Sequence, residues 1–252
     1  DVSCAIAPSL KGKYLGLEET LKTDSGLTWL KHLGINALEF LPLQEFDDHP
    51  YGIYHWGYMT TLFFAPESIY ATSPYGKQVT EFKKMVDTLH REGFAVIMDV
   101  VYNHTGAPHY YSGFDNPYYY RLTKELSNMN YSGCGNDFKT ENPMVRKLIV
   151  ESVLYWIEEY HIDGFRFDLG ELIDPITLRE IHSRAKAIKP DVLLILEPWS
   201  FRGNNKGLFN DLDWAYWNDD FRNCVKDAIR GHLNLEQFKK VVEGSTRLWT
   251  AN

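Results

Sequence analysis

The chain has 252 residues, of which 44% are hydrophobic, 24% charged and 15% aromatic. This composition is that of a globular protein with enough apolar material for a core, and it excludes disordered, collagen-like and coiled-coil proteins. The formal net charge of -8, from 34 acidic and 26 basic residues, makes a nucleic-acid backbone or an anionic membrane a poor partner. We therefore expect a neutral partner.

Targeting and cysteine signals are weak. No apolar run reaches the ~18–20 residues that a membrane span needs, and the first residues show no signal peptide. Cys4, Cys134 and Cys224 are scattered and have no CxxC spacing, which disfavours a metal cluster or a disulfide framework. The compartment stays open, with cytoplasm or plastid favoured, and the oligomeric state is not determined.

Along the chain, a segment with helical periodicity is followed by a short apolar run four times. The pairs are 27–34 with 35–43, 79–93 with 94–101, 144–162 with 163–169, and 177–190 with 191–199. The apolar runs lack polar alternation, as expected for parallel strands covered by helices. This order predicts an α/β fold, either doubly wound or closed into a barrel. No glycine-rich phosphate motif follows any run, so nucleotide binding loses its usual support.

The predicted elements have recognisable ends. Gly93 is placed to stop a helix in the left-handed conformation, and Asn142 with Pro143 is placed to begin the next one. Two stretches look irregular. Residues 57–76 follow the first strand, and residues 102–138 are rich in Asn, Gly and Tyr without a helical period. The second is too long for an ordinary loop and predicts a functional insertion.

Three predicted strands end in an acid, namely Asp99, Asp168 and Glu197. Carboxyl ends of parallel strands share one face, where active sites of such folds lie, so these acids should converge. Arg166 and Asp168 are two positions apart and should point to the same side, away from the flanking phenylalanines. The arginine favours an ionised Asp168, whereas Glu197 lacks a nearby cation in the sequence and has apolar neighbours, which favours a raised pKa.

Other polar and aromatic residues fall near the same predicted edge. Asn103 and His104 follow Asp99 closely, and His104 is a plausible partner for a substrate hydroxyl. The aromatic residues at this mouth are Tyr54, Trp56, Tyr58, Tyr102 and Trp199. As a group beside acids, they predict a cleft that stacks on sugar rings.

Two mechanisms use acids in this way. In a retaining glycosidase, one carboxylate attacks the anomeric carbon and a second, protonated one assists the leaving oxygen. The alternative is an enolase-type divalent-metal site, which needs a basic residue on the neighbouring strands. Residues 36–43 and 193–197 contain no lysine, so the glycosidase is favoured.

These residues resemble a known family. DVVYNH (99–104), GFRFD (164–168) and EPW (197–199) resemble the first three signature regions of the α-amylase superfamily, glycoside hydrolase family 13. YHWGY (54–58) is similar to a segment after the second strand of that family. GCGND (133–137) and WNDDFR (217–222) are similar to its isoamylase and pullulanase debranching branch.

The resemblance implies a (β/α)8 TIM barrel and retaining hydrolysis of α-glucosidic bonds in starch- or glycogen-type glucans. It implies that Asp168 is the nucleophile, Glu197 the general acid/base, and Arg166 the residue that positions the nucleophile. Asp99, His104 and Tyr58 match groups that hold the sugar, and residues 102–138 match an inserted domain B. We add Trp199 and Asn103 as substrate-binding residues.

No cofactor is required by this chemistry. Some members of the family bind a structural Ca²⁺ near domain B, to which Asn103 or Asp137 could contribute. No protein ligand for a catalytic metal is expected.

The sequence also departs from the family pattern. No adjacent His–Asp pair, the fourth signature, follows Glu197. Strands 2–6 of the barrel can be counted, and strands 1, 7 and 8 cannot. We therefore expect residues 1–252 to form a partial barrel with open edges and exposed apolar faces. Cleavage of α-1,6 branch bonds is favoured. An α-1,4-acting amylase or glucanotransferase, and a catalytically incomplete glucan-binding segment, remain alternatives.

Overall fold

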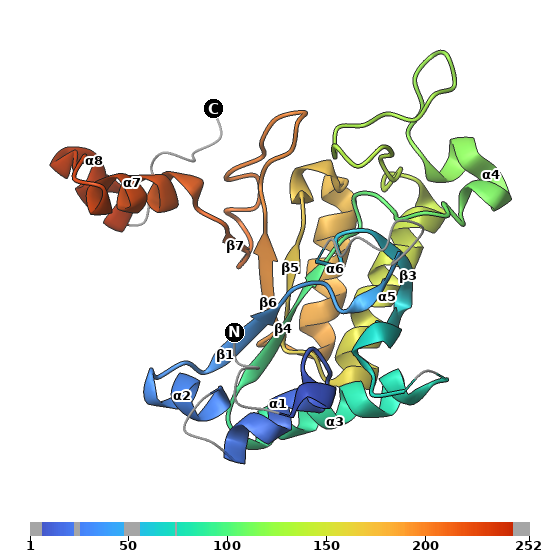
Figure 1. Cartoon of the computed structure of the whole chain (residues 1–252). Helices are drawn as coiled ribbons and strands as arrows, with labels where there is room; N and C mark the ends of the chain where they lie inside the picture. Colours follow the sequence, from blue (N-terminus) through green and yellow to red (C-terminus); the bar gives the residue numbers. More distant parts are fainter. Residues whose placement is uncertain (1–6, 23–25, 48–55, 74, 244–252) are drawn as a thin grey trace.

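The computed structural model describes residues 7–22, 26–47, 56–73 and 75–243 (Figure 1). Its main sheet contains five parallel strands in the order β1-β4-β5-β6-β7. The strands are β1 (Ala37–Phe40), β4 (Ala95–Val100), β5 (Gly164–Phe167), β6 (Leu193–Leu196) and β7 (Ala215–Tyr216). Each of the four apolar runs contributes one strand, so the predicted parallel α/β sheet is confirmed. The short β7 has no periodic signal of its own.

Three long helices cover one face of this sheet: α3 (Lys77–Arg91), α5 (Pro143–Tyr160) and α6 (Pro175–Ile188) (Figure 1). The other described α-helices are α1 (Gly16–Glu19), α2 (Leu27–His32), α4 (Ser112–Tyr119), α7 (Asp219–Ile229) and α8 (Leu235–Val242). Short 3-10 turns lie at Pro8–Leu10, Thr20–Lys22, Ser68–Tyr70 and Gly170–Leu172.

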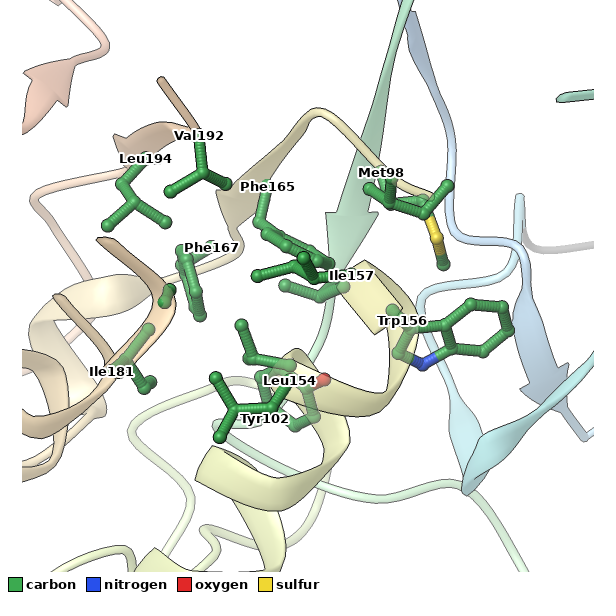
Figure 2. Packing of buried hydrophobic residues seen from close by; sticks show 14 of the residues in the cluster. Met98, Tyr102, Leu154, Trp156, Ile157, Phe165, Phe167, Ile181, Val192 and Leu194 are labelled. Carbon is green, nitrogen blue, oxygen red and sulfur yellow. The ribbon is translucent and has the colours of Figure 1, made fainter. Parts of the chain in front are cut away.

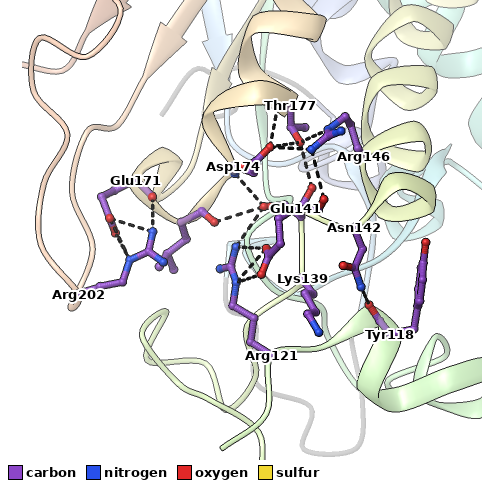
Figure 3. A network of polar contacts seen from close by, with 12 residues as sticks. Tyr118, Arg121, Lys139, Glu141, Asn142, Arg146, Glu171, Asp174, Thr177 and Arg202 are labelled. Carbon is purple, nitrogen blue, oxygen red and sulfur yellow. Dashed lines mark hydrogen bonds and ion pairs between the residues drawn. The ribbon is translucent and has the colours of Figure 1, made fainter.

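The helix ends follow local chemistry. Gly93 lies just beyond α3 with φ +83°, the left-handed value that glycine adopts without steric cost. Pro143 is the first residue of α5 after Asn142, as predicted, but the Asn142 amide donates to the Tyr118 carbonyl oxygen instead of capping the helix. At α6, a carboxylate oxygen of Asp174 accepts the Thr177 N–H at 3.0 Å. Figure 3 shows this cap and the Arg146 guanidinium that contacts it.

The hydrophobic core lies between the sheet and these helices. Phe165 and Phe167 of β5 are fully buried, and they lie next to Ile157 on α5 and Ile181 on α6 (Figure 2). Tyr102 lies in the same core, where its hydroxyl contacts Gln44 and Ser152. The expectation that Tyr102 lines the mouth of a cleft is therefore wrong, because alternation after β4 turns its ring toward the helices.

A separate two-stranded antiparallel sheet pairs β2 (Gln44–Phe46) with β3 (Thr60–Pro66). The sequence reading of 57–76 as irregular was wrong for this part. Leu62 and Phe64 are partly exposed while Phe63 between them is buried. The strand thus has the period of two, but apolar residues on both faces hide it in the sequence.

The region 102–138 is largely without regular structure and contains the short helix α4, which is interrupted at Asp115. Isolated bridges between Tyr120 and Phe138 and between Leu122 and Asn128 hold its loops together. The reading without any helix was wrong for α4, because its two short turns are too brief to show periodicity. Its status as an inserted domain stays a prediction.

The face of the sheet opposite the helices is open in the described part of the chain. Leu41, Leu193 and Trp217 lie at or beside this face and are 46%, 46% and 43% exposed. Helices α7 and α8 project away from the sheet beyond β7 (Figure 1). Five strands in one sheet with an uncovered inner face fit the predicted partial barrel. Within the described residues, no helix has the length and hydropathy needed to cross a membrane.

Candidate active site

The carboxyl ends of β4, β5 and β6 bring the predicted acids together. Asp99 is directly opposite Arg166 in the β4–β5 register. The strand ladder continues past β5 and β6, because the N–H of Asp168 donates to the Val100 carbonyl oxygen and that of Glu197 to the Phe167 carbonyl oxygen. The side chains of Asp99, Asp168 and Glu197 therefore emerge at one edge of the sheet.

Arg166 is the centre of this group. Its Nη1 lies 3.0 Å and 3.1 Å from the two carboxylate oxygens of Asp99 and 2.9 Å from Oδ1 of Asp168. Its Nη2 lies 3.0 Å from Oε2 of Glu197. Glu197 has no cation nearby in the sequence, but in the fold Arg166 of β5 reaches across to the end of β6 and contacts it.

Burial sets the direction of the pKa shifts of Glu197 and Asp99. It raises the pKa of Glu197 above its ordinary value, and the charge of Asp168 adds to this rise although Arg166 opposes it. Burial also raises the pKa of Asp99, to about 7, against the lowering effects of Arg166 and Tyr58. The pKa of Glu197 is therefore raised, as expected, but the cause of the rise is desolvation rather than the absence of a cation.

Asn103 and His104 lie behind the carboxylates. Nδ2 of Asn103 donates to the Asp168 carbonyl oxygen at 2.8 Å and to its Oδ2 at 3.0 Å. His104 has Nδ1 at 2.6 Å from Oδ1 of Asn103 and Nε2 at 2.7 Å from the Tyr58 carbonyl oxygen. Both side chains are buried, and burial lowers the pKa of His104. Their predicted contact with substrate stays a prediction.

A cavity of about 340 Å³ opens in front of the acids. Its lining residues are Glu39, Leu41, Tyr58, Asp99, Arg166, Glu197, Trp199, Trp217 and Arg222. Asp168 is nine-tenths buried and lies beside this wall rather than in it. The Tyr58 hydroxyl donates to Oδ2 of Asp99 at 2.6 Å, so it orients a carboxylate of the cavity.

Aromatic side chains form part of the cavity wall. Trp199 and Trp217 line it, and the Arg222 guanidinium lies 6.0 Å from the centre of the Trp199 ring. Trp56 is exposed and is absent from the lining, and Tyr54 lies outside the described residues. Two of the five aromatic residues predicted at the mouth, Tyr58 and Trp199, thus line the cavity.

Three lining residues were missed in the sequence: Glu39, Trp217 and Arg222. The signal for Glu39 was an acid inside an otherwise apolar run, and burial raises its pKa. Trp217 and Arg222 belong to WNDDFR, which was noted for its resemblance but was given no role. They reach the cavity because β7 pairs with β6, and the chain then passes through Trp217 into α7, which contains Arg222.

The residues considered for calcium do not fit such a site in this arrangement. The two carboxylate oxygens of Asp137 accept the N–H groups of Tyr131 and Ser132, and Oδ1 of Asn103 faces His104. Calcium requires six to eight oxygen ligands. Among the described residues, no group of three or more His, Cys, Asp or Glu side chains could hold a metal ion.

Comparison with known sequences gives related enzymes. No protein-family model matches the chain. It is 36% identical to isoamylase 3, chloroplastic, of rice, across 100% of this chain and 35% of the relative. It is 38% identical to a pullulanase of Bacillus subtilis, across 86% of this chain and 33% of the relative. A GlgX homologue of Mycobacterium tuberculosis is 35% identical across 98% of this chain and 37% of the relative.

Solved structures give the same picture. A pullulanase of Paenibacillus barengoltzii in complex with maltohexaose and α-cyclodextrin matches with a TM-score of 0.79 and 32% identity, over 89% of this chain and 39% of that one. A pullulanase of Anoxybacillus in complex with maltotriose matches with a TM-score of 0.82 and 31% identity, over 95% and 39%. The chain thus spans well under half the length of the proteins that it matches.

Proposed function

The chain is a homologue of the isoamylases and pullulanases, the debranching branch of the α-amylase superfamily, and from this premise we propose that the protein hydrolyses α-1,6 branch bonds in starch- or glycogen-type glucans. The relatives and structural neighbours are glycoside hydrolases by name. Two of the neighbouring pullulanases carry malto-oligosaccharides. An α-glucan is therefore the substrate class proposed for the cavity.

One observation carries the proposal. The two terminal nitrogens of the Arg166 guanidinium contact Asp168 and Glu197, each within 3.0 Å. A planar guanidinium is small, so the two carboxylates lie close together, Glu197 in the cavity wall and Asp168 beside it. A retaining glycosidase needs its two carboxyl groups ~5–5.5 Å apart on either side of the scissile bond.

In the proposed mechanism, Asp168 attacks the anomeric carbon and forms a glycosyl ester. Glu197, whose pKa is raised by burial, acts as the general acid and gives its proton to the departing glycosidic oxygen. Glu197 then removes a proton from water, whose oxygen attacks the anomeric carbon and displaces the carboxylate of Asp168. Arg166 keeps Asp168 in place, while Asp99 and Tyr58 hold the sugar.

The remaining residues of the wall support binding in this proposal. Trp199 and Trp217 offer ring faces that stack on the apolar faces of sugars. No step uses a cofactor, so we expect turnover to be unchanged after treatment with a metal chelator. Loss of turnover on chelation, with recovery on adding Ca²⁺, would contradict that expectation.

The function is tested with three glucans on the full-length enzyme, not on residues 1–252 alone. Pullulan and amylopectin contain α-1,6 bonds and linear amylose does not. We expect reducing ends to be released from the first two and not from amylose. Activity on amylose alone would replace the debranching proposal with an α-1,4-acting hydrolase, and products longer than the substrate would indicate glucan transfer.

A further inference from the structure

The turn that follows strand β5 contacts Glu197 through its backbone. The N–H of Leu169 donates to Oε2 of Glu197 at 2.7 Å, and Nη2 of Arg166 lies 3.0 Å from the same oxygen. Two donors on Oε2 make it the accepting oxygen, so Oε1 is the atom that carries the proton of the neutral carboxyl group. The Leu169 N–H has no part in the mechanism above, although it helps to select the oxygen of Glu197 that acts as the acid.

The backbone of this turn is strained. Leu169 has φ +39° and ψ +47°, in the left-handed region that residues with a side chain rarely adopt. Gly170 follows in close contact with β6, where an added Cβ would lie 2.2 Å from Cδ1 of Leu196. A conformation of this kind persists only where the surrounding structure holds it. The contacts that hold this turn come from the loop after β6.

That loop grips the carboxylate of Glu171. Arg202 donates from Nε to Oε1 of Glu171 at 3.0 Å and from Nη2 to its main-chain oxygen at 2.8 Å (Figure 3). The Ser200 hydroxyl donates to Oε2 of the same carboxylate. The side chain of Glu171 is 12% exposed, so the carboxylate has little water to replace these donors. We call Glu171, Ser200 and Arg202 the Glu171 clamp.

The Glu171 clamp joins the two segments that carry the proposed reacting groups. Glu171 lies three residues after Asp168, and the other two members lie within five residues after Glu197. Asp168 is also held by side chains outside the clamp, because Arg166 donates to its Oδ1 and Asn103 to its Oδ2. Loss of the clamp should therefore displace the general acid more than the nucleophile.

We propose that the Glu171 clamp positions the general acid. It holds the strained turn so that the Leu169 N–H stays on Oε2 of Glu197 and the transferable proton stays on Oε1. Glu171 acts through this turn and does not contact the sugar in the proposed reaction, so it is a positioning residue. The role rests on the proposed function, in which Glu197 gives its proton to the leaving oxygen.

The loop after β6 has attachments besides the clamp. The N–H of Phe201 donates to the Tyr131 carbonyl oxygen at 3.1 Å, and Trp199 forms a bridge with Asn204. Removing one clamp side chain should therefore loosen the turn and leave the protein folded. Arg202 has the more exposed side chain of the ion pair, so Arg202→Ala serves as a second variant that removes the same contact.

The first test observes the turn and needs no activity. Hydrogen exchange of the full-length enzyme is followed by mass spectrometry on peptides that contain Leu169. We expect exchange there to be at least about 10-fold faster in Glu171→Ala and in Arg202→Ala, because the turn opens more often. The double variant should exchange no faster than either single variant, since both remove one contact. Unchanged exchange in both single variants would overturn the proposal.

The second test separates loss of acid assistance from a general loss of structure. The fluoride of α-maltosyl fluoride leaves with little help from an acid, whereas the leaving oxygen of a glucan needs a proton. We expect Glu171→Ala in the full-length enzyme to lower kcat/KM about 10- to 100-fold on pullulan, part of what a general acid supplies, and less than about threefold on the fluoride. Equal losses on both substrates, or no loss on pullulan, would contradict the role.

The control is Asp211→Ala. Asp211 forms a similar ion pair with Arg179, with N–O distances of 2.8 Å and 3.3 Å, and in the described structure neither residue bonds to the Glu171 clamp. It should leave both kcat/KM values, and the exchange near Leu169, within about twofold of the native values. If the full-length enzyme hydrolyses no glucan, the proposed function fails, while hydrogen exchange at Leu169 still decides whether the clamp holds the turn.

Discussion

Arg166 contacts three carboxylates whose roles in the proposed reaction differ. Asp168 has an N–H donor on each oxygen, from Arg166 and Asn103. Glu197 accepts the Leu169 N–H at 2.7 Å on the oxygen that also meets Arg166. The three acids come from three strands, and one guanidinium holds them in place. Substitutions that change a single carboxyl group to an amide therefore test the role of each acid.

Two amide substitutions test the roles of the acids. Asp168→Asn removes the nucleophile, and we expect no glycosyl-enzyme to accumulate with an activated glucosyl substrate, as measured by mass spectrometry of the intact protein. Glu197→Gln removes the transferable proton and should lower kcat about 10²- to 10⁴-fold, with maltotriose binding kept in calorimetry. Near-native hydrolysis by either variant would show that its role is misassigned.

Asp99 predicts a pH dependence of stability. Its pKa is about 7 in the folded protein, above the ordinary ~3.9 of an unfolded chain. Between these values the folded state binds more protons, so Asp99 contributes stability at low pH and that contribution is lost as pH rises through about 7.

The neutral variant Asp99→Asn isolates this effect. We expect the free energy of unfolding of the native protein, relative to the variant, to fall from pH 4 to pH 7 by at most about 1.4 kcal/mol per pH unit. Urea denaturation at several pH values measures it. A difference that does not change with pH, or that grows in favour of the native protein, would contradict the raised pKa.

At the scale of elements, helix α6 depends on Asp174. This carboxylate caps the helix through the Thr177 N–H and also contacts Arg146 of α5 at 3.0 Å (Figure 3). Asp174→Ala should lower the free energy of unfolding by about 1–2 kcal/mol, the usual value for a lost cap. The matched change is Asn234→Ala, which removes the equivalent cap of the exposed helix α8. It should cost less, about 0.5–1 kcal/mol, and an equal or larger cost would argue against the contribution of Arg146.

The strands also show where sequence patterns are sufficient to predict an element and the face that its side chains occupy. Strand β5 was predicted from an apolar run that follows a helical segment, and the period of two then placed Phe165 and Phe167 on the face opposite to Arg166. Strand β3 was missed because Leu62 and Phe64 are as apolar as the buried Phe63. Tyr102 was assigned to the wrong side because the chain leaves β4 there, and a pattern does not show which way a strand continues.

At the scale of the whole molecule, the described residues bound the cavity on one side only, the side of the sheet β1 and β4–β7. Leu41 of the cavity wall and Leu193 at the start of β6 remain about half exposed, and the described sheet does not close. We expect this 252-residue chain by itself to show negligible turnover on pullulan, because the sugar is held from one side. Robust turnover by the chain alone would show that the described residues hold the sugar sufficiently.

The sequence by itself determined the parallel α/β arrangement, the three acids at strand ends and the pairing of Arg166 with Asp168, because strand period and strand direction are local properties. Tertiary structure alone decided that Arg166 also reaches Asp99 and Glu197, that Glu39, Trp217 and Arg222 line the same cavity, and that His104 faces two oxygens. These contacts join residues from different elements, and their distances depend on how the strands and loops pack. Burial also depends on how the elements pack. Because burial raises the pKa values of Asp99 and Glu197, these shifts were decided by the tertiary structure as well.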